Sequence, residues 1–210
     1  MPDTSREDSK MNRRSVLRGG TAAAAGMLGI TAVESGITPA SASVDMYHVM
    51  GNPAETGEGL PFPKNLTHEE HRNLKTFDEA DFVVFSNQQW DRFDESHTQD
   101  VRVHWPDGHY TDGLDPHVED LKWLFAWAPN LKITSHPVRV AKGNLVSAVG
   151  VFKGTFSRPM PDGNGGVIPP TGKSFAMSMV TVGIFNRRGT MDEEFLFYDN
   201  LAFNQQIGLA

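Results

Sequence analysis

The sequence contains no cysteine among its 210 residues. Disulfide bonds, zinc–thiolate sites, iron–sulfur clusters and a cysteine nucleophile are therefore excluded, because each of them needs a cysteine sulfur. A lipid-modified cysteine at an export cleavage site is excluded for the same reason. Eight histidines and four tryptophans remain as the side chains of greatest chemical interest.

Positive charge is also scarce. The chain holds 19 lysines and arginines against 26 acidic residues, which gives a formal net charge of −7. Non-specific binding to nucleic acid needs a basic surface, so we expect no nucleic-acid partner. With 39% hydrophobic residues, the length fits one domain of ordinary size and a tail.

The N-terminus carries the pattern of an export signal. Asn12–Arg18 includes the arginine pair of a twin-arginine signal, and a weakly apolar run follows at 19–33. Ala40-Ser41-Ala42 then offers a small-x-small cleavage site. We therefore predict a signal peptide at residues 1–42. The alternative is a disordered or amphipathic N-terminus.

The predicted signal implies export to a periplasm, a cell surface or the medium. Its apolar run is short and glycine-rich for a membrane span, so we expect no stable span once the signal is removed. The start codon could correspond to Met1 or to Met11, because the residues before Met11 are polar.

Residues 43–65 are rich in glycine, proline and polar residues and are predicted to form an irregular arm. One domain is expected over 66–210. Its helices are predicted from a cap at Asn65 or Thr67 to Asn87, over 89–97, and over 116–128. Strands are predicted at 101–105, 109–111, 132–141, 145–156, 174–186 and 190–198, and a short helical turn at the end. Helices followed by an antiparallel meander favour an α+β fold, with the helices packed on one face of a curved sheet.

The last strand contains two adjacent acids, Glu193 and Glu194. Side chains of a strand alternate between its faces, so the two carboxylates should point in opposite directions. One of them can then face an apolar interior, where a carboxylate is costly unless it is paired or used.

Four short motifs carry a family resemblance. They are Asp100–Gly108, Thr111–His117, Asp192–Asp199 and Gln205–Gly208. In this order and spacing, the region from about 77 to 209 resembles the SnoaL-like polyketide (ester) cyclase branch of the nuclear transport factor 2-like superfamily.

The resemblance implies a cone-shaped α+β barrel with a pocket between the helices and a curved, mainly antiparallel sheet. It also implies a homodimer formed through the sheet. Characterised cyclases of this branch close a ring in an aromatic polyketide ester by an intramolecular aldol reaction. They need no metal or cofactor, and a pocket aspartate on the last strand is the general acid/base.

This chain departs from that pattern. Leu196 stands where those cyclases carry the acid, and Glu194 is the nearest carboxylate on the same face. His104 takes the place of a family asparagine. We expect His104 and Glu194 to be the proton-handling pair, with the pKa of Glu194 raised by an apolar pocket. The alternatives are a partly exposed strand histidine and a structural acid paired with that histidine or an arginine.

A ligand-binding wall is expected from large apolar and aromatic side chains. The candidates are Trp90, Phe93, Trp123, Trp127, Met177, Leu196 and Tyr198, although sequence alone does not separate core from pocket wall. A metal site built from His104, His109, His117 and Asp112 is the weaker reading, because their spacing is not compact. We expect no metal and no cofactor.

The sequence thus predicts an exported acid/base cyclase or isomerase that acts on a polyketide-like or other apolar carbonyl compound. The alternative is a protein of the same fold that binds a small apolar ligand without turnover, because Leu196 cannot transfer a proton.

Overall fold

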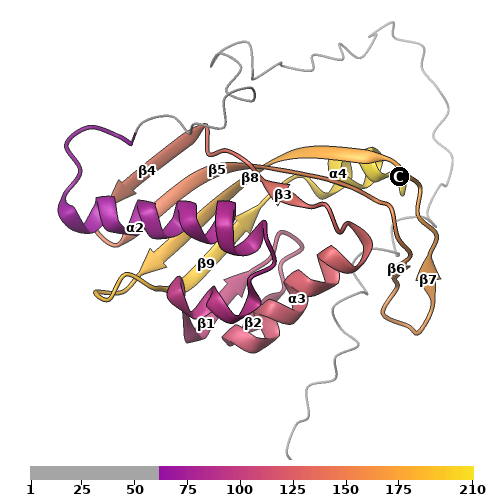
Figure 1. Ribbon diagram of the computed structural model, residues 1–210, viewed down its shortest axis with the longest axis horizontal. Helices are drawn as coiled ribbons and strands as arrows, with labels where there is room; N and C mark the ends of the chain where they lie inside the picture. The colour runs from indigo at the N-terminus through magenta and orange to yellow at the C-terminus, as the bar shows by residue number, and fades with distance from the viewer. Residues whose placement is uncertain (1–61) are drawn as a thin grey trace, which may run out of the picture.

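The computed structural model describes residues 62–210, so the predicted signal peptide and most of the predicted arm lie outside the described residues. Helices α2 and α3 lie on one side of a long, twisted sheet, and α4 lies near one end of it (Figure 1). The helical elements are α2 (His68–Glu79), the π-helix η3 (Ala80–Phe85), the 3-10 helix η4 (Trp90–Glu95), α3 (Leu114–Trp127) and α4 (Asn200–Ile207). The strands are β1 (His97–His104), β2 (Tyr110–Asp112), β3 (Lys132–Ile133), β4 (Val138–Lys142), β5 (Leu145–Thr155), β6 (Met160–Pro161), β7 (Val167–Ile168), β8 (Ser174–Phe185) and β9 (Met191–Phe197).

The main sheet has seven strands in the order β2-β1-β9-β8-β5-β3, and β4 also pairs with β5. Every pair is antiparallel except β1 with β9, which run parallel. The expected α+β class is confirmed. The sheet does not close into a complete barrel, because β2 stands at one edge and β3 and β4 stand at the other. Strands β6 and β7 form a separate hairpin beyond α3 (Figure 1).

Helix α2 begins at the predicted cap. The Thr67 hydroxyl accepts a hydrogen bond from the backbone N–H of Glu70, and the Glu70 carboxylate accepts one from the N–H of Thr67. This capping box satisfies two N–H groups that the first turn leaves free. The second oxygen of Glu70 accepts from Gly143 N at 2.9 Å, so the same side chain ties the helix to the β4–β5 turn.

The chain beyond α2 widens into a π-helix. The N–H of Ser86 bonds the carbonyl of Asp81, and the N–H of Gln89 bonds that of Val84, each five residues earlier. Ser86 Oγ also donates to the Asp81 carbonyl at 2.7 Å. Single-turn π-helices occur frequently at functional sites. Here η3 turns Asp81 and Phe85 toward the interior pocket.

The predicted helix over 89–97 is wrong at its C-terminal end. The helical segment ends at Glu95, and β1 begins at His97. The N–H of Met191 donates to the carbonyl of Ser96 at 2.7 Å, and His97 pairs with Met191 in the parallel β1–β9 ladder. Pairing with a distant strand therefore overrides the local helical preference of this segment.

The predicted strand over 132–141 is also corrected. It divides into β3 and β4, and both pair with β5. Pro137 has no N–H for a ladder, and His136 beside it turns fully inward. Two partly buried hydrogen bonds from the His136 ring to carboxylates compensate for the interrupted strand.

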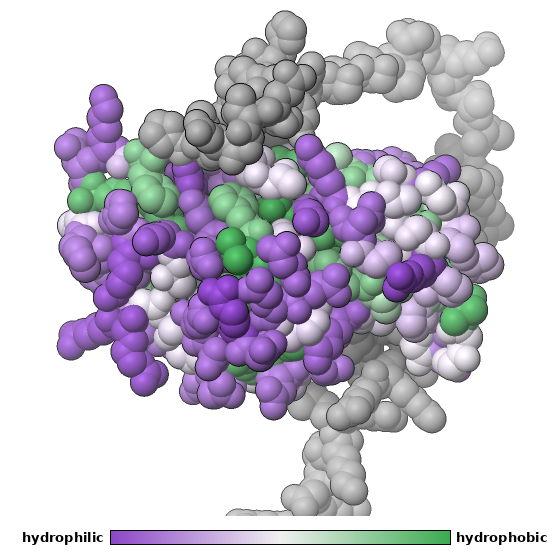
Figure 2. All heavy atoms as spheres, viewed as in Figure 1, coloured by the Kyte–Doolittle hydropathy of each residue, from purple (hydrophilic) through white to green (hydrophobic). Residues whose placement is uncertain are grey.

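Two buried clusters hold the domain together. The larger one joins η3, η4, α3 and the sheet around fully buried residues such as Val101, Val103 and Trp127. The smaller one joins α2 to the β4–β5 end of the sheet through Leu74, Phe77 and their neighbours. Hydrophilic side chains predominate over α2 and α3 on the face shown in Figure 2. Within residues 62–210, no helix has the length and apolar character that a bilayer crossing requires.

Candidate active site

An interior pocket lies between the helices and the sheet, with a cavity volume of about 70 Å³. Its wall is mostly apolar and aromatic, and residues from η3, η4, α3, β9 and α4 contribute to it. Five titratable side chains reach the wall, namely Asp81, His97, His117, Glu194 and Tyr198. Apolar pockets with a few convergent polar groups are the usual form of a small-molecule site.

Strand β9 supplies the central acid. Glu194 is 8% exposed and lines the pocket with Leu196, two residues further on. Glu193 points to the other face, as the alternation of a strand requires. The expectation that the two acids face opposite sides is therefore confirmed.

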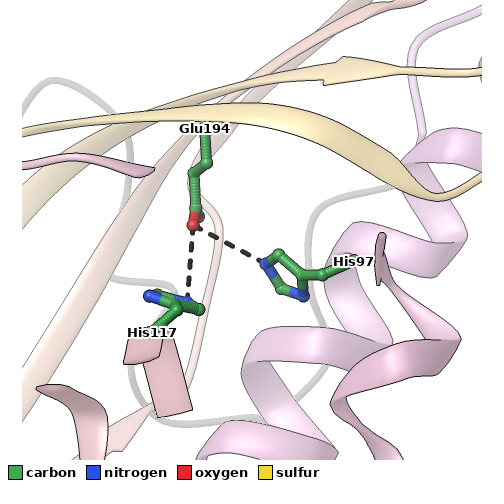
Figure 3. Close-up of side chains that lie close together, drawn as sticks. All are labelled: His97, His117 and Glu194. Atoms are coloured by element: carbon green, nitrogen blue, oxygen red, sulfur yellow. Dashed lines mark ion pairs between the residues drawn. The ribbon is translucent and has the colours of Figure 1, made fainter. Parts of the chain in front are cut away.

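Two histidines face Glu194. Its Oε2 lies 3.6 Å from Nε2 of His97 and 3.8 Å from Nε2 of His117. Glu194 projects from β9, His97 from the first residue of β1 and His117 from the first turns of α3, so the three side chains converge from separate elements (Figure 3). All three are buried.

Contacts on the side away from Glu194 fix the orientation of the His97 ring. Its Nδ1 lies 2.8 Å from Ser96 Oγ and 3.3 Å from the carbonyl of Phe93. The ring also stacks on Phe93 at 5.6 Å between centroids. These contacts fix the orientation of the imidazole and leave Nε2 directed at Glu194.

His117 is buried among aromatic rings rather than polar groups. Trp105 and Phe93 lie 5.9 and 6.2 Å from it between ring centroids. Its Nδ1 has no hydrogen-bond partner among the described residues. Burial therefore lowers the pKa of His117 to about 4, only partly opposed by the charge of Glu194.

The charge state of Glu194 differs from expectation. Burial acts to raise its pKa, but the interaction with His97, and to a smaller extent with His117, holds the pKa below its usual value, although both rings stand beyond hydrogen-bond distance. The predicted raised pKa is therefore wrong in direction, because the pocket places imidazoles beside the carboxylate. Glu194 is therefore an ionised carboxylate at neutral pH, and His117 is a neutral imidazole.

These three side chains offer donor atoms that all lie within 4.8 Å of one another, the pattern of a two-histidine, one-carboxylate metal site. Donors around zinc or a similar ion stand about 3.0–3.4 Å apart, so a small contraction would be needed. A metal-bound histidine normally donates its other N–H to an oxygen. His97 has such partners, but Nδ1 of His117 would become a buried donor without an acceptor. The site therefore fits proton transfer better than metal binding.

The expected pair of His104 and Glu194 does not form. His104 Nε2 lies 2.7 Å from Glu193 Oε1, and its ring stacks on Phe195 at 4.2 Å on the outer face of the sheet. Val103 is fully buried on the pocket side, so His104 must point away from the pocket. The weaker metal set also separates, because Asp112 pairs with Arg102.

The expected ligand-binding residues divide into two groups. Three of the seven line the pocket, namely Phe93, Leu196 and Tyr198. Four lie elsewhere: Trp90 packs on Phe93, Trp123 donates to the carbonyl of Pro161, and Trp127 and Met177 are buried in the core. Burial raises the pKa of Tyr198 to about 12, so its hydroxyl stays protonated.

Sequence reasoning missed His97, His117 and Asp81 as pocket residues. One signal was present for His117, which lies three residues after Leu114 and four before Leu121 on the buried stripe of α3. His97 had no such signal once it was assigned to a helix. Asp81 had none because a regular α-helix would not predict the wider turn of η3.

The comparisons with known proteins agree with this fold. The family model for SnoaL-like polyketide cyclases matches residues 78–207, and the chain belongs to this family. No curated protein sequence matches the chain.

Several solved structures share the fold. A proposed SnoaL-like polyketide cyclase of Jannaschia sp. CCS1 is 19% identical, with a TM-score of 0.61 over 70% of this chain and 99% of that one. IdmH of Streptomyces antibioticus, a proposed polyketide cyclase, is 22% identical, with a TM-score of 0.56 over 66% and 99%. A similar protein of Xanthomonas campestris is 15% identical, with a TM-score of 0.57 over 66% and 98%.

Proposed function

We propose that this protein is an acid/base cyclase or isomerase that acts on an apolar carbonyl compound, with Glu194 as the base. The supporting observation is a buried, ionised carboxylate in an apolar pocket, 3.6 and 3.8 Å from two imidazole nitrogens. Glu194 removes a proton from the carbon next to a carbonyl, and that electron pair forms an enolate. His97 replaces His104 as the histidine partner of the proposed pair.

The pocket also offers a donor for the developing negative charge. Tyr198 lines the wall and remains protonated at neutral pH. A hydrogen bond to the enolate oxygen stabilises the transition state more than the uncharged ketone. Such a donor compensates for the modest basicity of Glu194, whose pKa is lowered.

The pocket limits the size of the ligand. An engineered apolar cavity of about 150 Å³ in another protein holds one benzene molecule. The cavity here is about 70 Å³, so the closed form is smaller than a single six-membered ring requires. Even a cyclic ketone needs its wall to move outward, for example at Phe203 of α4, and a polycyclic substrate needs a larger movement.

The test is hydrogen–deuterium exchange next to the carbonyl of cyclopentanone, cyclohexanone and 2-indanone, followed by NMR in D₂O. Glu194→Gln should slow the exchange roughly 100-fold or more, because a glutamine cannot accept the proton. Glu193→Gln is the matched control, since its carboxylate lies on the outer face beside His104. Equal exchange rates in wild type and Glu194→Gln would remove Glu194 as the base.

A second candidate is a binding protein without turnover. Leu196 lines the pocket at the position where related cyclases carry their acid, and this observation favours the binding role. Mass spectrometry of compounds that co-purify with the folded protein separates the two functions. Recovery of one unchanged apolar compound, together with no exchange of any ketone, would favour binding alone.

We also propose a homodimer formed through the outer face of the sheet. Val138, Val149, Val180 and Phe197 are paired side by side across four strands, and the outermost, Phe197, is 54% exposed. A continuous apolar row at the surface commonly marks a protein interface. Phe197→Glu should reduce the sedimenting mass to that of a monomer. Leu201→Glu, on the exposed side of α4, should leave the mass unchanged.

Export by the twin-arginine route is proposed from the N-terminal pattern alone. Replacing Arg13 and Arg14 together by lysine should keep the protein inside the cell and uncleaved. Arg18→Lys, outside the arginine pair, is the control and should leave export intact. Export of the double variant would contradict the proposed route.

A further inference from the structure

A second buried histidine lies outside the Glu194 group. The His136 side chain is completely buried, and both of its ring nitrogens face carboxylates. Nδ1 lies 2.7 Å from Asp78 Oδ1, and Nε2 lies 2.8 Å from Asp81 Oδ2. Asp78 is in turn bound by Arg139, so the chain of contacts is Arg139–Asp78–His136–Asp81.

Hydrogen-bond chemistry determines the number of protons shared by these four side chains. A neutral imidazole has one N–H, whereas two carboxylates facing its two nitrogens both accept. Either His136 is an imidazolium, or one carboxyl group carries the missing proton. Burial acts to lower the pKa of His136, but the bonds to Asp78 and Asp81 outweigh it and raise the pKa to about 9. The imidazolium form therefore satisfies both contacts at neutral pH.

Of Asp78, His136 and Asp81, only Asp81 reaches the pocket. Asp81 lines the cavity, whereas Asp78 and His136 do not. Asp81 uses Oδ2 for His136, and within residues 62–210 its Oδ1 makes no hydrogen bond, which leaves that oxygen for a ligand. The π-helix places Asp81 there.

Asp81 and Glu194 are electrostatically coupled across the pocket. Burial is the main reason that the pKa of Asp81 is raised, the bond to His136 opposes this, and the charges of Glu194 and His97 act in opposite directions. The pKa of Glu194 is lowered. Two carboxyl groups whose environments move their pKa values apart are typical of an acid and a base that act together.

From this geometry we infer that Asp81 is a second proton-transfer residue of the pocket and that His136, Asp78 and Arg139 position it. The inference rests on the proposed function and adds the missing acid. Glu194 takes a proton from the carbon next to one carbonyl, and the enolate carbon attacks a second carbonyl group. As the new carbon–carbon bond forms, the π electrons move to the carbonyl oxygen, which takes a proton from Oδ1 of Asp81. Asp81 enters this step as the neutral acid, with its Oδ2 still accepting from the His136 imidazolium. Glu194 then releases its proton to water and Asp81 regains one.

Intramolecular aldol cyclisation of 2,6-heptanedione, measured beside the ketone exchange assay, tests this role. Formation of the carbon–carbon bond needs an acid at the second carbonyl oxygen, so Asp81→Asn should slow cyclisation roughly 100-fold. Ketone exchange, which uses Glu194 and the Tyr198 donor, should stay within about threefold of wild type in this variant. Asp78→Asn tests the positioning role, because it removes the carboxylate on the other side of the same imidazole, away from the pocket. It should slow cyclisation less than roughly tenfold and shift the pH profile, since it alters the charge of His136.

The outcomes separate the two proposals. Cyclisation lost in Glu194→Gln but retained within about twofold in Asp81→Asn would overturn the role of Asp81 and leave the proposed function standing. Exchange retained in Glu194→Gln, or absent from wild type with all three ketones, would overturn both.

A second measurement uses only the wild-type protein, in case Asp81→Asn does not fold. The carboxyl carbon of Asp81 should shift in the ¹³C NMR spectrum when 4-nitrophenol, an analogue of an enol, is added. The carboxyl carbon of Glu193, on the outer face, should not shift. An Asp81 signal that is unchanged at saturating 4-nitrophenol would overturn the inference.

Discussion

His117 and His136 are both buried beside carboxylates, yet their pKa values move in opposite directions. The pKa of His117 is lowered to about 4, and that of His136 is raised to about 9. Their exposures are 3% and 1%, so burial does not explain the difference. The carboxylate contacts do. His136 has two at 2.7 and 2.8 Å, whereas His117 has one at 3.8 Å.

The difference teaches that a buried imidazolium is stable only with direct hydrogen bonds to carboxylates. Removing an imidazolium from water is costly, and a carboxylate beyond hydrogen-bond distance offsets only part of that cost. His136 is therefore a structural cation that holds Asp78 and Asp81 in place. His117 is a neutral ring whose proton content can respond to a ligand.

The largest expected effect is the loss of stability on removal of His136, compared with the removal of His117. His136→Leu leaves the partly buried carboxyl groups of Asp78 and Asp81 without their shared hydrogen-bond donor and should reduce the free energy of unfolding by roughly 3–5 kcal/mol. His117→Leu removes no side-chain hydrogen bond within residues 62–210, because the nearest carboxylate oxygen lies 3.8 Å away, and should change the free energy of unfolding by less than about 1 kcal/mol. Urea unfolding at pH 7 measures both. Equal losses in the two variants would contradict the comparison.

The free energy of unfolding should fall at alkaline pH because His136 loses its proton. Its folded pKa of about 9 lies above the ordinary value of 6.5. The folded state therefore holds its proton more tightly, and the resulting stability is complete below pH 6.5 and disappears as the pH rises through 9. The difference corresponds to roughly 3 kcal/mol. The advantage of wild type over His136→Leu in urea unfolding should decrease by that amount between pH 6.5 and 10.

An advantage that stays constant across this range would mean that His136 is not an imidazolium in the folded protein. His117→Leu is the control, because His117 is already neutral above pH 6.5 in both the folded and the unfolded state. Its alkaline limb should follow that of wild type.

Much of the fold could be predicted from sequence because its signals are local. Thr67 begins a helix through a capping box, and β5, β8 and β9 lie within one or two residues of their predicted ends. The alternation of Glu193 and Glu194 followed from strand geometry alone. These features depend on neighbouring residues, and so the sequence contains what determines them.

The site could be predicted only in part, because distant contacts assemble it. Glu194 was identified from its face of β9. Its partner His97 was not, because strand pairing with Met191 converts the end of a predicted helix into β1. His104 was placed on the wrong face, although Val101 and Val103, which alternate with it on the same strand, are apolar and favoured the correct one. Predicting Asp81 as a pocket residue would have required the π-helix to be predicted first, and no local pattern indicated it.

The smallest expected effect concerns the titration of His117 at acid pH. Its folded pKa of about 4 lies below 6.5, so the unfolded state gains a proton first and stability falls as the pH falls from 6.5 toward 4. The charge of Glu194 raises the pKa of His117, and Glu194→Gln removes that charge. The ring protons of His117 should then titrate at a lower pH, by less than about one unit in the NMR spectrum. Glu193→Gln, on the outer face, should leave this titration unchanged, and an equal shift in both variants would show that His117 responds to net charge rather than to its contact with Glu194.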